Sequence, residues 1–352
     1  MKSILLVAGV SLSLAFWHQT SVGIEVSGGT MVDVVVADSG STDSTILTEL
    51  AGGWLPKGPT SFDIDTSGGI YIMDQYGCKI IKYDKNGNFA SVIPIKVETD
   101  SQIYCLLSDM AVDNNGGIHV VVRYRERSGK SSYFPDTLFN LSEDGKLLFK
   151  IPCSQLISTD KHGDLINYQG PINIYSPKGK HRATIEYSYG YTDIGIAQKV
   201  AGDDIFFRSN QNLMRTSLKD FLKTGKLDTA ATLLQTIKPP DTPEIKFEMY
   251  GSKFVLLGYD NNKCFYFYHL RNIYNERMSP ICLSHLIVKS RLEEGELLEV
   301  GTIEIDFQRG QDECSDKELF DFRKQFIIAG DGTIYFLHGT VDKIKVSKIT
   351  IE

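Results

Sequence analysis

Acidic and histidine side chains are the first places to look for chemistry in this chain, and their spacing is informative. Asp63, Asp65, Ser67 and Gly68, followed by Asp74, have the spacing of an EF-hand calcium loop. An EF-hand places that loop between two helices, whereas the segments here alternate in the manner of strands. Aspartate at these positions also satisfies the backbone of a tight turn. We therefore interpret the run as turn chemistry and predict no metal site there.

The histidines are dispersed and follow no ligand spacing. His119 and His338 fall on or just after predicted strands, and neither an HxH nor an HExxH pattern occurs. A GxSxG nucleophile elbow, a P-loop and a dinucleotide fingerprint are also absent. A metal site built from several distant segments stays open, because sequence spacing does not report it. The sequence therefore names no catalytic group and no cofactor.

The elements that would position such residues come from a repeat. Residues 58–89 contain three short alternating segments, at Ser61–Ile64, Ile70–Met73 and Ile80–Tyr83, and a fourth begins at Phe89. Tight turns rich in Asp and Gly join the first segment to the second and the third to the fourth. This pattern predicts a four-stranded antiparallel meander with short turns at one end and longer loops at the other.

Similar units begin near residues 61, 109, 156, 198, 247 and 326. Most steps match the roughly 40–50 residues of one four-stranded propeller blade. We predict an all-β, six-bladed β-propeller, with Val32–Val36 as an N-terminal strand that completes the last blade and closes the ring. Residues 283–321 lengthen the last step and are interpreted as an insertion or a long hairpin. A seventh blade stays open as an alternative.

A two-domain α/β fold is the competing architecture. It requires strands to alternate with helical patterns of roughly 10–15 residues, and helical periodicity is nearly absent. We therefore expect residues 24–352 to form a single propeller domain. The six cysteines are widely and irregularly spaced without a CxxC pair, so they do not predict zinc, and their disulfide state stays open.

The first 23 residues have the pattern of a signal peptide. Lys2 precedes a mostly apolar run over Ile4–Phe16, and Ser21-Val22-Gly23 offers a cleavage site with small residues. The run is shorter than the roughly 20 residues that span a bilayer, and no second run of that length follows. We expect a secreted or periplasmic protein with no transmembrane segment after cleavage; an uncleaved anchor is the alternative.

The repeat resembles the units of NHL-type propellers. The matching residues of the first unit are Asp65, Gly68, Ile70, Tyr71, Asp74, Ile80, Tyr83, Asp84 and Gly87, and those of the second are Asp113, Gly116, Ile118, Asp144 and Gly145. The whole chain also looks like six-bladed propeller proteins exported by Bacteroidetes-type bacteria. This resemblance implies a fold. NHL-type propellers include binding modules, lyases and hydrolases, so it implies no single activity.

The longer loops of such a meander lie together on one face of the ring, at the mouth of the central channel. Loops on a rigid scaffold usually carry function, so we predict a ligand site there. Its candidate residues are Trp54, Lys57, Asp74, Tyr76, Arg123, Tyr124, Arg208, Asn210, Tyr259, Asp260 and His338. This mixture of aromatic rings and hydrogen-bonding groups suits a polar ligand such as a glycan or a peptide.

The preferred function is a binding or scaffold protein that recognises a polar ligand or a protein partner. The alternative is a propeller lyase or hydrolase acting on a carbohydrate or a small ester, which convergent histidines and carboxylates at the mouth would favour. The formal net charge of −7 argues against a nucleic-acid partner, because phosphate binding needs a concentrated basic surface.

Overall fold

The computed structural model describes residues 24–48, 58–97, 103–126, 136–153, 157–159, 164–167, 172–185, 199–201, 204–209, 212–217, 232–236, 255–274, 280–293, 296–308, 324–339 and 342–351. These residues form strands and turns and contain no helix. Across these ranges there is consequently no helix that is long and apolar enough to cross a membrane. The predicted signal peptide, residues 1–23, lies outside them.

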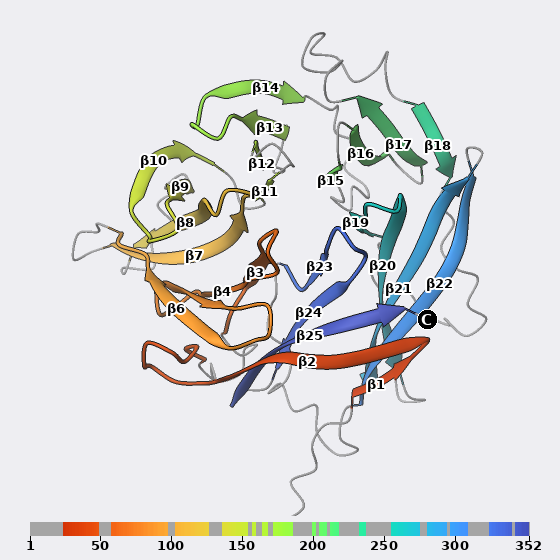
Figure 1. Ribbon diagram of the computed structural model, residues 1–352, viewed down its shortest axis with the longest axis horizontal. Coiled ribbons are helices and arrows are strands. Elements are labelled where there is room, and N and C mark those ends of the chain that lie inside the picture. The colour runs from red at the N-terminus through yellow and green to blue at the C-terminus, as the bar shows by residue number, and fades with distance from the viewer. Residues whose placement is uncertain are drawn as a thin grey trace, which may run out of the picture.

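Antiparallel sheets surround a common axis in a propeller arrangement (Figure 1). The first three sheets follow the chain in order. One contains β3 (Ser61–Ile64), β4 (Ile70–Asp74), β5 (Lys79–Tyr83) and β6 (Phe89–Pro94). The next contains β7 (Ile103–Val112), β8 (Ile118–Glu126), β9 (Thr137–Leu141) and β10 (Leu147–Pro152). The third contains β11 (Ile157–Thr159), β12 (Leu165–Asn167), β13 (Ile172–Tyr175) and β14 (His181–Ile185).

The remaining sheets complete the circle. The fourth contains β15 (Lys199–Ala201), β16 (Asp204–Ser209), β17 (Asn212–Ser217) and β18 (Thr232–Thr236). A five-stranded sheet contains β19 (Val255–Tyr259), β20 (Cys264–Tyr274), β21 (Pro280–Glu293), β22 (Glu296–Gln308) and β1 (Ile24–Ser27). The closing sheet contains β23 (Phe326–Ile328), β24 (Ile334–Gly339), β25 (Lys343–Ile351) and β2 (Gly29–Asp38).

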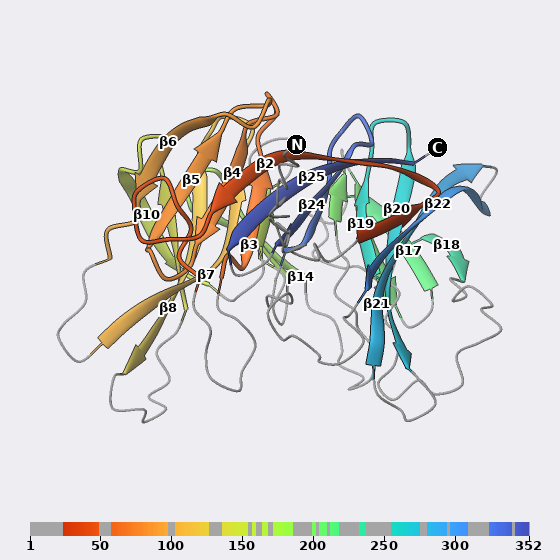
Figure 2. The same cartoon turned by 90° about the horizontal axis from the view of Figure 1, so that it is seen from below.

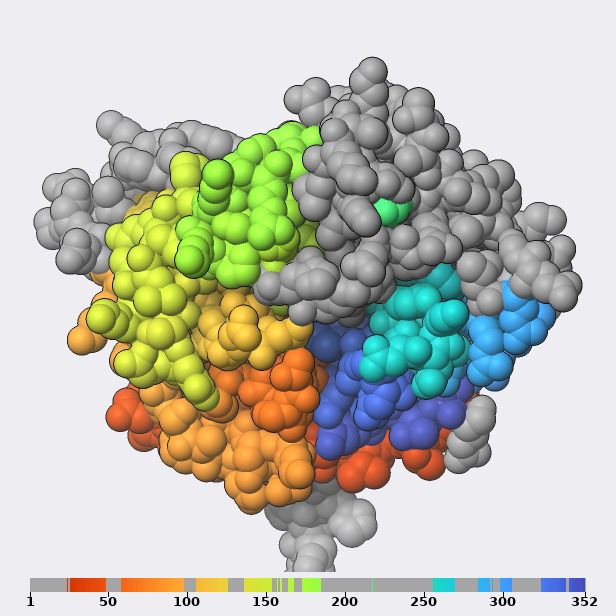
Figure 3. Space-filling model, turned by 45° about the horizontal axis from the view of Figure 1, so that its top comes forward, coloured from red at the N-terminus to blue at the C-terminus, as the bar shows by residue number. Residues whose placement is uncertain are grey.

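The predicted ring closure is confirmed. β2, which contains Val32–Val36, pairs antiparallel with β25 over Gly29–Asp38, so the two ends of the chain share one sheet. In the space-filling view the red N-terminal segment accordingly lies against the blue C-terminal strands (Figure 3). The sequence analysis missed β1, which pairs with β22 from Ile24 to Ser27 and attaches the N-terminal segment to a second sheet.

Two expectations about blade composition need correction. Five sheets are four-stranded blades, whereas six were predicted, and the sheet of β19–β22 has five strands because β1 is added to it. Residues 283–321 were expected to be an insertion or a long hairpin. The described part is a hairpin of β21 and β22 that supplies two strands of this sheet, so the insertion alternative is wrong for residues 283–308. The first strand of the unit expected near 247 is β19, which begins at Val255.

The core lies between neighbouring sheets. One buried cluster combines Tyr71 and Met73 of β4 with Val120 and Val122 of β8, and a second combines Tyr266 and Ile287 of the five-stranded sheet with residues of the closing sheet. Further clusters cover the second face of the sheet β3–β6 and of the sheet β7–β10, so these two sheets are buried on both faces, as stacked blades are. Seen from the side, the tight turns and the ends of the long strands β8 and β21 lie at opposite faces of the ring (Figure 2).

Candidate functional site

The first strands of the sheets surround the axis, and two of them, β3 and β7, carry an acid there. Neighbouring first strands contact one another, β3 with β7, β7 with β11, β15 with β19 and β19 with β23. The sequences of β3 and β7 explain how these strands are joined, because each is a mostly apolar strand that contains one acid, Asp63 or Asp109. An acid placed inside an apolar strand must find polar partners, and here it finds them on the next sheet.

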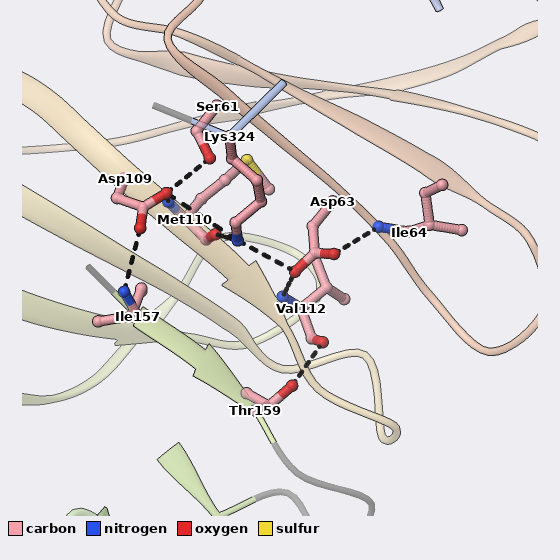
Figure 4. A network of polar contacts seen from close by, with 9 residues as sticks. All are labelled: Ser61, Asp63, Ile64, Asp109, Met110, Val112, Ile157, Thr159 and Lys324. Carbon is pink, nitrogen blue, oxygen red and sulfur yellow. Dashed lines mark hydrogen bonds and ion pairs between the residues drawn. The ribbon is translucent and has the colours of Figure 1, made fainter. Parts of the chain in front are cut away.

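Asp109 is the most deeply buried of these acids, with 1% of its surface exposed. Its Oδ1 accepts hydrogen bonds from the Ser61 hydroxyl at 2.7 Å and the Met110 N–H at 2.8 Å. Its Oδ2 accepts from the Ile157 N–H at 3.0 Å. Burial raises the pKa of Asp109, while Lys324 and these donors oppose the rise. The carboxylate thereby connects β3, β7 and β11 (Figure 4).

Asp63 repeats the arrangement closer to the tight-turn end of β3. Its Oδ2 accepts a hydrogen bond from the Val112 N–H at 3.0 Å and its Oδ1 accepts from the Ile64 N–H at 2.9 Å. The carbonyl of Val112 in turn accepts from the Thr159 hydroxyl at 3.0 Å. Three successive first strands are thus joined a second time. Unlike Asp109, the Asp63 side chain keeps 17% of its surface exposed.

Lys324 brings a positive charge to the same place from the other end of the chain. Its N–H donates to the Thr60 carbonyl at 3.2 Å, and its ammonium group donates to the Met110 carbonyl. The Nζ atom lies 3.7 Å from Asp63 Oδ2 and 3.9 Å from Asp109 Oδ1. Figure 4 shows the amine between the two carboxylates. Sequence analysis missed Lys324, because its partners are remote along the chain.

The axial network, defined as Asp63, Asp109 and Lys324, can serve two purposes. It holds the first strands together, because each carboxylate accepts backbone N–H groups across a strand boundary. It also leaves two charged groups partly accessible at the axis, since the Lys324 side chain is 20% exposed and Asp63 is 17% exposed. The exposed part of the network thus offers an ammonium donor beside a carboxylate acceptor to a polar group at the axis.

Two predicted site residues, Asp74 and Tyr76, lie at the loop between β4 and β5. Asp74 is fully buried, and its oxygens accept from the Gly77 N–H at 2.8 Å and the Leu47 N–H at 3.1 Å. Burial raises its pKa, and Lys79 lies 3.7 Å away. Asp74 therefore anchors the segment before β3 to the loop. Tyr76 is half-buried in that loop.

Arg123 and Tyr124 lie on β8. The Arg123 guanidinium pairs with Asp136, with Nε 3.4 Å from Oδ1, and Tyr124 packs against the apolar cluster between the first two sheets. Arg208 lies on β16, where its backbone pairs with Leu213. Trp54, Lys57 and Asn210 lie outside the described residues.

The expected placement of Tyr259 and Asp260 at the long-loop face is wrong. They belong to the tight turn between β19 and β20, because the first strand of this sheet begins later than the sequence suggested. Asp260 is 1% exposed, and its Oδ1 accepts from the Asn262 and Cys264 N–H groups, both at 2.9 Å. Tyr259 packs on Phe265 with ring centroids 4.8 Å apart.

His338 was expected to reach a loop, and that expectation is also wrong. It lies within β24 with 4% of its surface exposed, and its ring stacks on Phe336 at 4.8 Å. Its Nε2 lies 2.7 Å from the Ser347 hydroxyl. Burial lowers the pKa of His338, so the neutral ring is the form that this environment favours.

The turn interpretation of the EF-hand-like run agrees with the geometry. Asp65 Oδ1 accepts from the Ser67 N–H at 2.9 Å and the Gly69 N–H at 2.8 Å, and its Oδ2 accepts from the Tyr71 hydroxyl. Asp63 instead faces β7, and Asp74 faces the loop after β4. The three acids therefore have separate partners. Over the described ranges, no group of three or more His, Cys, Asp or Glu residues is placed to hold a metal ion.

Comparison with known proteins supports the fold. The chain matches no protein-family model and no curated protein. Among solved structures it is similar to a member of the DUF4221 family from Bacteroides vulgatus, at 10% identity and a TM-score of 0.51, covering 94% of this chain and 98% of that one. It is also similar to a candidate exported protein from Bacteroides fragilis, at 10% identity and a TM-score of 0.46, covering 94% and 95%.

A third similar structure is a virginiamycin B lyase from Staphylococcus aureus, at 12% identity and a TM-score of 0.43, covering 94% of this chain and 100% of that one. Propeller neighbours thus include lyases as well as exported proteins. At these identities the similarity concerns the fold alone. The sheets, their arrangement around an axis and the first of these comparisons define an all-β propeller with antiparallel four-stranded blades.

Proposed function

We propose that this chain is a binding or scaffold protein that recognises a polar ligand, such as a glycan or a peptide, at the axial opening. The observation that supports the proposal is the pair of Lys324 and Asp63, which are charged, lie at the axis and are partly exposed. An ammonium donor beside a carboxylate acceptor can bind hydroxyl, amide and amine groups. A polar group entering the opening would meet both.

The burial of four of the described acids and histidines also favours recognition over proton transfer by these groups. A general acid or base must reach its substrate within hydrogen-bond distance. Asp74, Asp109 and Asp260 are each almost fully buried and accept backbone N–H groups, and His338 is buried inside a sheet. These four groups therefore serve the fold.

We further propose that the five-stranded sheet counts as a sixth blade of an NHL-like propeller, that residues 24–352 form one domain, and that residues 1–23 direct export. The chain would then be secreted or periplasmic. The support is the signal-peptide pattern of Lys2, the apolar run Ile4–Phe16 and Ser21-Val22-Gly23. N-terminal sequencing of the protein recovered outside the cytoplasm should find a mature end near residue 24; recovery with Met1 intact would contradict export by cleavage.

The binding proposal is tested by screening oligosaccharides and peptides for a shift in melting temperature, followed by titration calorimetry on each hit. Lys324→Met should weaken binding at least tenfold, and Asp63→Asn should weaken it as well. Lys82→Met is the matched control, because its side chain is 19% exposed against 20% for Lys324 but it lies on β5, away from the axial network.

Lys324→Arg separates charge from structure, since it keeps a cation near the two carboxylates. Melting curves of all four variants establish that each is folded before its affinity is compared. Equal affinity in Lys324→Met and Lys82→Met would reject the axial site.

A further inference from the structure

The closing sheet is held by a polar network that includes a buried histidine. β2 reaches this network through Asp33, which lies where the register of β2 against β25 shifts. The Lys345 ammonium donates to Asp33 Oδ2 at 2.7 Å, and the Ser347 hydroxyl donates to Asp33 Oδ1 at 2.6 Å. His338 Nε2 lies 2.7 Å from the same hydroxyl oxygen. The N-terminal strand is thus tied to both β25 and β24.

The direction of these bonds assigns the histidine tautomer. A serine hydroxyl has one proton, and that of Ser347 is given to Asp33. The bond between His338 and Ser347 must therefore use a proton on His338 Nε2, with the hydroxyl oxygen as acceptor. The result is a chain from His338 through Ser347 to Asp33 that joins β24, β25 and β2. The neutral ring with its proton on Nε2 already supplies that donor.

A second buried histidine faces the first across the sheet boundary. His285 lies on β21 and is 2% exposed, and its ring centroid is 5.7 Å from that of Phe336, on which His338 stacks. Tyr268 of β20 places its hydroxyl 2.8 Å from His285 Nδ1. Phe326 of β23 packs against His285 at 5.5 Å. The interface between the five-stranded and closing sheets therefore contains two imidazoles that have little access to water.

We propose that this interface, the closing seam, is an acid-sensitive latch, at which β2 leaves β25 when the medium is acidified while the other blades stay folded. Protonation of either histidine would place a positive charge in the buried seam. Water can solvate that charge once β2 has left β25, so the open state is favoured. Opening would uncover Val35 and Ala37, which β2 buries against the cluster shared with β3–β6. The inference does not depend on the proposed ligand site.

The direction of the pH dependence follows from the groups that face each ring. Burial lowers the pKa of His338; Asp33 on β2 opposes this, and Lys345 on β25 adds to it. Burial, with His338 as the facing charge, lowers the pKa of His285 to about 3. The folded-state pKa values of His285 and His338 both lie below the ordinary histidine value of 6.5. Their full contribution to the stability of the seam is therefore present above pH 6.5 and is lost as the pH falls below it.

Asp33 does not set the onset of opening. The neighbouring His338, whose Nε2 lies 3.7 Å from Asp33 Oδ1, followed by Lys345 and Ser347, holds the pKa of Asp33 well below its usual value of 3.8. Its contribution is lost only as the pH falls below about 4, which is the ordinary range of an aspartate. Between pH 6.5 and 4 the two histidines therefore determine the change.

Hydrogen–deuterium exchange on the full chain tests the latch, with amide rates corrected for the intrinsic pH dependence of exchange. From pH 6.5 to 4.5 the opening of β2 should rise by up to about tenfold per pH unit for each histidine. β6, the outer strand of the first sheet, is the internal control and should change little. A parallel rise in β2 and β6, or no rise in β2, would overturn the proposal.

The double variant His285→Gln and His338→Gln completes the test. A glutamine amide can still donate to Ser347 but takes up no proton in this range. Exchange of β2 in this variant should be independent of pH between 6.5 and 4.5. If the variant does not fold, the comparison of β2 with β6 in the unmodified chain still decides the question. A pH dependence that persists in the folded variant would assign the opening to other groups.

Discussion

Two interfaces between neighbouring sheets of this propeller differ in the side chains that form them. The interface between the sheets β3–β6 and β7–β10 is a cluster of aliphatic and aromatic side chains, among them Tyr71, Met110 and Phe139. The closing seam has a similar apolar cluster but adds His285 and His338 and the charged pair of Asp33 and Lys345. The first joins consecutive segments of the chain, whereas the second must recruit β1 and β2 from its far end.

The difference teaches where specificity is needed. Consecutive blades are adjacent because the chain connects them, so apolar packing makes up most of their interface, while the polar contacts of Asp63 and Asp109 join their first strands. A closing strand has to find one register among several, and directional polar contacts at Asp33 select it. Polar selection has a chemical consequence, because it adds two buried histidines to the seam, whereas the titratable groups Asp63, Asp109 and Lys324 lie at the axial edge of the first interface.

The largest expected effect tests whether the two interfaces are equally important. Phe336 is fully buried in the seam and stacks on Phe326 at 4.6 Å, and Phe139 is fully buried in the first interface. Phe336→Ala and Phe139→Ala should each lower the free energy of unfolding by about 3–5 kcal/mol. Urea denaturation measures both. Leu148→Ala, at a side chain that is 58% exposed, should cost less than about 0.5 kcal/mol. If Phe336→Ala, unlike Phe139→Ala, lowered the free energy of unfolding by only a small amount, the seam would contribute less to stability than the first interface.

Contact between a turn and the closing strand gives the next effect. Gly87 has φ +84°, and a Cβ there would lie 1.5 Å from the Val34 carbonyl oxygen of β2. Gly116 has φ +80°, but its nearest neighbour would be 3.7 Å away. Gly116→Ala should therefore cost only the backbone strain, about 1 kcal/mol, and Gly87→Ala at least about twice as much. Thermal melting compares the two variants. Equal losses of stability would show that β2 moves away from the turn to make room for the new methyl group.

The charged part of the seam should contribute less than its packing. Asp33→Asn should lower stability at pH 7 by about 1 kcal/mol, because partial exposure screens its pairing with Lys345. The folded-state pKa of Asp33 is lowered, so the deficit should be present above about pH 4 and shrink as the pH falls further. Asp38→Asn is the control, since Asp38 is 68% exposed and pairs with Lys343. A deficit that does not change with pH would contradict the charge argument.

The smallest effect concerns a cation over an aromatic ring in the regular region. The Lys82 ammonium lies 5.0 Å from the centre of the Tyr71 ring and 2.5 Å from Glu143 Oε1 of the next sheet. Lys82→Met should cost about 0.5 kcal/mol, and part of this cost should disappear in 1 M salt. Lys150 lies over Phe139 at 4.6 Å. Lys150→Met is the partner measurement, and a smaller salt dependence than at Lys82 is expected because the contact of Lys150 is with a neutral ring, whereas Lys82 also pairs with the Glu143 carboxylate.

Much of the fold could be predicted because its signals are local. Asp65, Gly68 and Gly69 form the turn that their types require, since an aspartate can bond to the backbone two and four residues later. The unit starting at Ser61 was located for the same reason. The unit near residue 247 was misplaced because β20 and β21 are long and carry no turn signal within them. That error moved Tyr259 and Asp260 to the wrong face.

The candidate site could be predicted less well. An acid inside an apolar strand, as at Asp63 and Asp109, is a signal that sequence reading can use, although it did not single out these acids for the site. Lys324 gave no such signal, because a lysine just before a strand is ordinary. His338 was placed at a loop because the end of β24 cannot be read from its composition. Each of these misses concerns burial, which depends on what another sheet brings to the residue.

The sequence by itself determined the repeating meander, the tight turns and the presence of a closing strand, since these depend on hydrogen bonds and side-chain alternation over a few residues. The tertiary structure alone decided that Lys324 meets Met110 from 214 residues away, that β1 joins a second sheet, and that two histidines are buried in the seam. The physical reason is that short-range preferences shape each blade, whereas the environment of a side chain is set by the neighbours that ring closure brings to it.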